Sequence, residues 1–232
     1  FLYRACYKAG YRVHIKMPRL TPKVKKLLLV MGPAALGAGV IQLNLLLDMI
    51  IASYLPDASM SYLYYADRLN QLPVGVIGVA LGTVLLPFLS RSIASGDEAL
   101  VVKSQNQAIE MGLFFTIPAA VAFIIVPNDL IHVLLERSNF SSEATLQTSL
   151  TLAAYAAGLP AYVLAKVFVP GYFARGDTKT PLKFAVVALI INVSLNLILM
   201  QYFAHVGLAI ATAISAWINV LMLGGGLIKK GH

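Results

Sequence analysis

Six long apolar stretches recur along the chain, and they constrain the fold more than any other feature of the sequence. Each has the roughly 20 mostly apolar residues that a helix needs to cross a bilayer. In hydrocarbon every backbone polar group must be satisfied within its own segment, so each stretch is predicted to be an α-helix. The fold class is therefore an all-α membrane protein, a bundle of six transmembrane helices. We predict the spans at about residues 27–55, 62–90, 108–126, 148–171, 184–203 and 206–228.

Charged residues make up only 12% of the chain, and most of them are basic. Lys and Arg gather in residues 1–26, before the first span, and again after the second, fourth and sixth spans. In the loops between the other spans, Arg137 is the only Lys or Arg. The positive-inside rule then places 1–26 and 229–232 in the cytoplasm, on either side of one six-helix lobe, 27–228. Cations confined to membrane boundaries favour a role in topology over nucleic-acid binding.

Arg68 stands inside the second apolar span, directly after Asp67. An arginine in hydrocarbon is costly, so it normally faces protein or a water-filled cavity. Ser61, Arg68 and Gln71 recur at helical spacing and form a polar stripe suited to a cavity wall. A guanidinium keeps its charge and binds phosphate or carboxylate, so we predict a substrate-binding surface of Arg68, Ser61, Gln71 and Asp67. The alternative is an internal ion pair with Asp48, which lies at a similar depth on the first span.

A second polar cluster is predicted from the depth in the membrane at which polar residues of different spans lie. Asn192 and Asn196 share a face of the fifth span, and Asp48 and Thr212 lie at a similar depth on the first and sixth spans. Carboxylate, amide and hydroxyl oxygens suit hard cations, and one negative charge suits a monovalent cation such as Na⁺. The alternative is hydrogen bonding between helices, which is common in membrane bundles. No other cofactor is predicted.

Other motifs are weaker. Pro73 removes a backbone hydrogen bond inside the second span, so Pro73 and Gly75 predict a hinge, with ordinary helix packing as the alternative. Lys166 lies near the inner end of the fourth span, and we interpret it as a lysine reaching that membrane surface. Scattered histidines and the single Cys6 predict no transition-metal site. No catalytic motif occurs, so we do not expect an enzyme.

The loops carry helix start signals. Ser95 and Glu98 have the spacing of a capping box before the third span. Pro127 and the apolar residues after it predict a short interfacial helix. Ser141 is predicted to begin the helix that leads into the fourth span.

Two ordered motifs carry a resemblance. Residues 64–69 with 72–87, and residues 166–181, resemble signatures of the MurJ (MviN) lipid II flippase family, in the MOP exporter superfamily. The resemblance implies that this chain is the second lobe of a longer protein whose N-terminal lobe is missing here. It implies lipid II and membrane lipid as partners, a bacterial inner-membrane location and alternating access. It also implies that Arg68 and Ser61 face the central cavity, and that the Asp48 cluster matches residues that hold sodium in some relatives.

Two other functions remain open at this stage. One is a different MOP-superfamily exporter, of polysaccharide-lipids or drugs. The other is a membrane-embedded enzyme acting on a polyprenyl phosphate, which would need acidic residues clustered at a membrane face.

Overall fold

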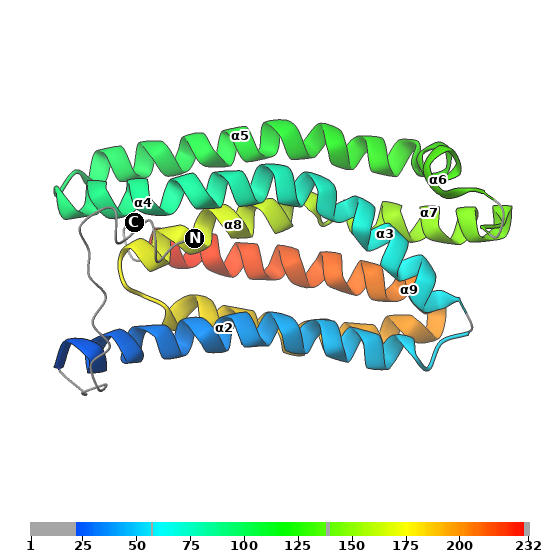
Figure 1. The fold of residues 1–232 in the computed structure, drawn as a ribbon, viewed down its shortest axis with the longest axis horizontal. Coiled ribbons are helices and arrows are strands. Elements are labelled where there is room, and N and C mark those ends of the chain that lie inside the picture. Colours follow the sequence, from blue (N-terminus) through cyan, green and yellow to red (C-terminus); the bar gives the residue numbers. More distant parts are fainter. Residues whose placement is uncertain (1–21, 57, 138–139, 230–232) are drawn as a thin grey trace, which may run out of the picture. The chain divides into compact units, whose positions relative to one another are not determined.

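A computed structural model describes residues 22–56, 58–137 and 140–229, and every element in those ranges is a helix (Figure 1). The chain divides into two units, Phe1–Gly32 and Pro33–His232, and the packing described below lies within the second. Residues 1–21 and 230–232, which hold most of the two predicted cytoplasmic segments, lie outside the described residues. The elements are α2 (Pro22–Ala52), α3 (Ser59–Pro73), η1 (Val74–Val79), α4 (Ala80–Ala94), α5 (Glu98–Ile125), α6 (Pro127–Leu135), α7 (Ser142–Ala156), α8 (Leu159–Ala174) and α9 (Lys179–Lys229).

The helices confirm the predicted bundle of six crossings. Four are long and apolar enough to span a membrane, and the pair α7 and α8, bent by 40°, makes a fifth. The sixth arises because α9 contains two arms joined at Ala204, whose φ of 47° and ψ of −128° are not helical. Asn192 bonds to Thr212 and Ser215, more than a dozen residues further on, so the chain must reverse between them.

The second crossing is continuous but irregular. After α3 the backbone widens into the π-helix η1, and α4 then resumes ordinary α-helical geometry. Pro73 ends α3 and lacks the N–H that would continue its hydrogen-bond ladder, which explains why the irregular turn begins there. The sequence predicts a hinge at Pro73 and Gly75, and that motion stays a prediction.

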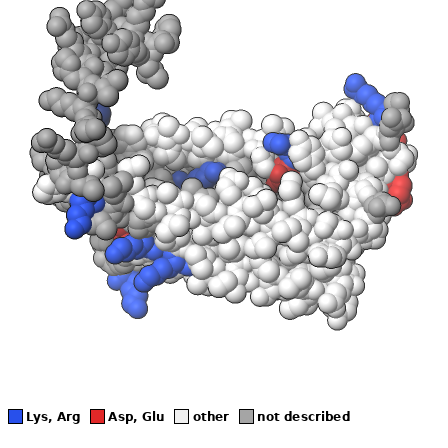
Figure 2. Space-filling view, turned by 60° about the horizontal axis from the view of Figure 1, so that its bottom comes forward, with Lys and Arg blue, Asp and Glu red and all other residues white. Residues whose placement is uncertain are grey.

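α8 is the central helix of the bundle, and α9, α5 and α4 pack on it. Val163 and Val167 on α8 are completely buried. Outward-facing apolar residues are the rule elsewhere: Val84, Phe114 and Leu221 are each about 70% exposed. Figure 2 shows most of the charged side chains towards the ends of the helices and a few in the middle of an otherwise uncharged face. This distribution suits a bundle whose outer surface meets lipid.

Two of the three predicted helix starts are confirmed. α6 begins at Pro127, and the Ser141 side chain caps α7 by accepting from the Ala144 N–H at 3.2 Å. The Ser95 cap is wrong, because Asp97 caps α5 by accepting from the Leu100 N–H at 2.9 Å. Gly96 has a φ of 77°, which ends the helical conformation after Ser95. Ser95 therefore belongs to the end of α4.

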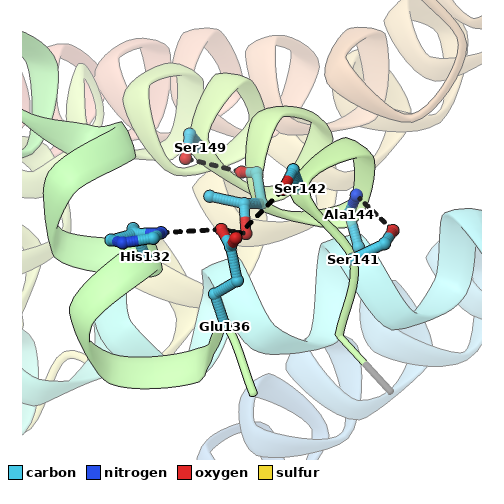
Figure 3. A network of polar contacts seen from close by, with 7 residues as sticks. His132, Glu136, Ser141, Ser142, Ala144 and Ser149 are labelled. Carbon is cyan, nitrogen blue, oxygen red and sulfur yellow. Dashed lines mark hydrogen bonds and ion pairs between the residues drawn. The ribbon is translucent and has the colours of Figure 1, made fainter. Parts of the chain in front are cut away.

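A polar network fastens α6 to α7 (Figure 3). The Glu136 carboxylate accepts from Ser142 Oγ at 3.0 Å and from Thr145 Oγ1 at 2.6 Å, and it contacts His132 Nδ1 at 2.8 Å. The bonds from Thr145, His132 and Ser142 lower the pKa of Glu136 to about 2. The same carboxylate raises the pKa of His132 above its ordinary value. The ionised Glu136 is therefore the group that holds this short helix in place.

We predict that docking of α6 depends on pH. The Glu136 contribution is complete above its ordinary pKa of 4.5 and is lost as pH falls towards 2. The His132 contribution is complete below its ordinary pKa of 6.5 and is lost as pH rises through its raised value. The amide exchange of α6 is measured at each pH in the parent and in Glu136→Gln. The parent should show the largest additional protection, relative to the variant, between pH 4.5 and pH 6.5. An equal difference at pH 2 and pH 5.5 would contradict this account.

Candidate functional site

The polar stripe predicted on the second crossing is exposed on α3. Ser61, Tyr64, Arg68 and Gln71 all lie on the surface of the bundle. The Arg68 guanidinium carbon sits over the Tyr64 ring, 4.9 Å from its centre. Such a cation–π contact offsets part of the loss of water without using the guanidinium N–H donors. Arg68 is therefore placed for binding an anion.

Arg68 makes no internal ion pair in the part of the chain that the structure describes. There the ion pairs within 4.0 Å join His132 to Glu136 and Arg175 to Glu98. The neighbouring Asp67 is half-buried and accepts a hydrogen bond from Gln71 instead. The alternative of an Asp48–Arg68 pair is wrong, because the Asp48 carboxylate is bonded elsewhere.

The structure brings together all four members of the predicted cation cluster. Asn196 Nδ2 donates to Asp48 Oδ1 at 2.6 Å and to Asn192 Oδ1 at 3.0 Å. Asn192 Nδ2 lies 3.3 Å from Thr212 Oγ1, its partner on the second arm of α9. Asn192 and Asn196 are buried, at 1% and 0% exposure, so these bonds lie inside the protein. The cluster thus links α2 to both arms of α9.

Two further residues complete this cluster and were missed from the sequence. Asn44 Nδ2 donates to Asp48 Oδ2 at 3.2 Å, and Ser215 Oγ lies 3.4 Å from Asn192 Nδ2. Both stand one helical turn from a predicted member, Asp48 or Thr212, and that spacing was the available signal.

The donor set of the cluster fits a small monovalent cation. Its oxygens come from one carboxylate, amide groups and a hydroxyl, which are hard ligands of low total charge. The Asn196 Oδ1 atom is buried and has no hydrogen-bond partner among the described residues. An unsatisfied carbonyl oxygen beside a carboxylate is a ready cation ligand. The remaining polar atoms already bond one another, so the cluster also serves as a link between helices.

Comparison with known proteins now identifies the chain. The family described as "Lipid II flippase MurJ" matches residues 1–232. A relative from Rhizobium meliloti (strain 1021), "Probable lipid II flippase MurJ", is 44% identical over 228 residues, which cover 98% of this chain and 42% of the relative. The structure titled "Lipid II flippase MurJ, inward closed conformation" has a TM-score of 0.77 and 31% identity, covering 99% of this chain and 48% of that one.

A more distant structural match is the "Outward-facing conformation of a multidrug resistance MATE family transporter of the MOP superfamily", with a TM-score of 0.78 at 20% identity. It covers 90% of this chain and 46% of that one, and at this identity it shows the fold alone. The fold is that of a multi-pass membrane protein and is shared with both of these transporter structures. The chain belongs to the MurJ lipid II flippase family. It spans less than half the length of the curated relatives it matches.

We predict that the cluster stabilises the bundle. Asn196→Leu removes the donor to Asp48 and Asn192 and leaves buried acceptors unpaired, at about 1–3 kcal/mol for each. Ser194→Ala is the matched control, because Ser194 is exposed on the same helix and bonds only to the Ile190 carbonyl. Thermal unfolding in detergent should show a clearly lower midpoint for Asn196→Leu. Equal midpoints for the two variants would remove the structural role.

Proposed function

We propose that this chain forms one half of a flippase for lipid II, the undecaprenyl-pyrophosphate-linked precursor of peptidoglycan, in the cytoplasmic membrane of a bacterium. The observation that carries the proposal is the exposed Arg68, which forms no ion pair with the described residues, on a chain of this family. The names of the relatives, "Probable lipid II flippase MurJ", support the substrate. An N-terminal lobe of the same protein supplies the facing wall of the cavity, and membrane lipid surrounds the rest.

In this proposal Arg68 binds the pyrophosphate of the substrate. Its planar, permanently charged fork matches two phosphate oxygens at once. Ser61 and Gln71 offer hydroxyl and amide groups along the same stripe, and Asp67 orients Gln71 through their hydrogen bond. The lobes rock about the cavity in alternating access, and the irregular turn at Pro73 and Gly75 is the hinge of this crossing. Transport is movement of the lipid without chemical change, so no catalytic residue is needed.

The orientation follows from the basic residues. The excess of Lys and Arg in alternate loops supports an orientation with both ends of this chain in the cytoplasm. Arg68 and the α6–α7 network then lie towards the outer side of the membrane. The substrate reaches Arg68 from the inner side of the cavity.

We predict that Arg68→Ala in the complete protein abolishes transport. The variant loses charge-assisted hydrogen bonds worth about 1.5–3 kcal/mol each. Arg68→Lys should rescue only in part, because an ammonium lacks the planar fork. Transport is measured in vesicles with fluorescent lipid II.

The matched control is Arg91→Ala, which removes an exposed arginine from the end of the same crossing. Both variants should insert into the membrane at the level of the parent. If Arg68→Ala moved lipid II as fast as Arg91→Ala, the ligand role of Arg68 would be lost.

We further propose that the cluster of Asp48, Asn192, Asn196 and Thr212 binds Na⁺. The support is the oxygen-rich donor set and the unsatisfied Asn196 Oδ1. Bound sodium would supply a positive charge to the Asp48 carboxylate and strengthen the link between α2 and α9.

This second proposal predicts sodium-dependent stability. A ligand present at a hundred times its dissociation constant stabilises the folded state by about 2.7 kcal/mol. The unfolding midpoint of the complete protein should rise in NaCl but not in N-methylglucamine chloride at equal ionic strength. Asp48→Asn should remove that difference. A sodium effect that persists in Asp48→Asn would place the ion elsewhere.

A further inference from the structure

Lys166 is a basic residue that neither the stripe on α3 nor the buried cluster uses. It lies in the middle of α8 and is exposed, while Val163 and Val167 beside it are buried. Its main chain and its side chain both press on the second crossing. A methyl group at Gly82 would lie 3.1 Å from the Lys166 carbonyl oxygen, and one at Gly78 only 2.7 Å from Lys166 Cδ. The two glycines therefore form a seam along which the lysine lies.

The direction of the Lys166 side chain follows from these contacts. Its carbonyl lies at Gly82, whereas Cδ and Cε lie at Gly78, one helical turn nearer to α3. The side chain thus runs towards the Arg68 end of the crossing and away from the end at Ala94. The interpretation of Lys166 as reaching the inner membrane surface is wrong, because helical side chains point towards the N-terminus of their helix.

The ammonium has no carboxylate partner in the described ranges, where both ion pairs involve other residues. An uncompensated charge inside a membrane crossing is costly, and contact with water or with an anion would offset that cost. Figure 2 shows basic atoms at more than one place in the middle of a face that is otherwise nearly uncharged, some of them in a hollow. An exposed lysine without a carboxylate partner among the described residues suits a passing anionic group.

We propose that Lys166 is a second anion-binding station, which binds the phosphate groups of the substrate lipid before or after Arg68 does. The inference rests on the proposed flippase function. Arg68 and Gly78 are ten residues apart, about 15 Å along the crossing. A pyrophosphate is shorter than that, so the two cations act in turn. Lysine, a point charge on a flexible stem, suits brief binding, and the arginine fork suits firmer binding.

Chemical rescue of a cysteine tests the need for this charge. In the complete protein, with Cys6→Ser and any other cysteine replaced, Lys166→Cys should transport lipid II roughly ten- to a hundredfold more slowly, the range for one charge-assisted hydrogen bond. Reaction with 2-aminoethyl methanethiosulfonate restores an ammonium at nearly lysine length and should restore transport. Methyl methanethiosulfonate adds bulk without charge and should not restore transport. 2-Sulfonatoethyl methanethiosulfonate adds a negative charge and should not restore transport either.

Lys103→Cys is the matched control, an exposed lysine at the start of α5 whose loss should leave transport unchanged under every reagent. Lys166→Met keeps the methylene contact with Gly78 and should be as slow as Lys166→Cys. The labelling rate of the cysteine at position 166 should fall with undecaprenyl pyrophosphate and not with undecaprenol.

The outcomes separate the two proposals. If the parent transports lipid II and Arg68→Ala does not, but Lys166→Met keeps the parent rate, Lys166 is no station. Equal rescue by the methyl reagent would also overturn the station, because volume rather than charge would then matter. If the cysteine at position 166 were inaccessible to the charged reagents, Lys166 would face lipid. A parent that moved no lipid II at all would overturn the flippase function and this inference with it.

Discussion

The lack of water in hydrocarbon constrains where polar residues can stand in this bundle. A polar group within a crossing must find a protein partner or a wet surface. Asp48 takes the first course, since amide groups from Asn44 and Asn196 surround its carboxylate. Arg68 and Lys166 take the second, because both are exposed and neither has a carboxylate partner among the described residues. The hydrogen-bonded groups link the helices, and the two exposed cations are the groups proposed to bind a ligand.

The two kinds of polar group stand on different helices, and this separation has a mechanical consequence. The buried cluster joins α2 to both arms of α9. Arg68 and the seam for Lys166 belong to the second crossing, which contains the π-helix η1. π-Helical turns inside α-helices are rare and are frequent at functional sites. The proposed ion site and the proposed substrate site therefore stand on separate elements, and any coupling between them would pass through helix packing.

Much of this arrangement could be predicted from the sequence, because depth in a membrane follows from counting residues. Counting from the outer turns placed Asp48, Asn192, Asn196 and Thr212 at one level, and the structure joins them. The six crossings followed from apolar length, and the last two are separated at Ala204, where the backbone is not helical. The binding roles of Arg68, Ser61, Gln71 and Asp67 stay predictions, although the structure exposes the first three on one helix.

Two of the failures share one physical cause, which is that the depth of a residue does not determine where its side chain points. Asp48 and Arg68 lie at similar depth, yet α2 turns Asp48 towards α9 and α3 turns Arg68 outward. Lys166 was assigned to the nearer membrane surface, but the glycines at 78 and 82 let α8 approach so closely that its side chain lies along their seam. Gly78 and Gly82 have the spacing of a GxxxG motif, which favours close helix packing. A small-residue seam facing a lysine therefore predicts the path of that side chain, which distance to the membrane surface alone does not.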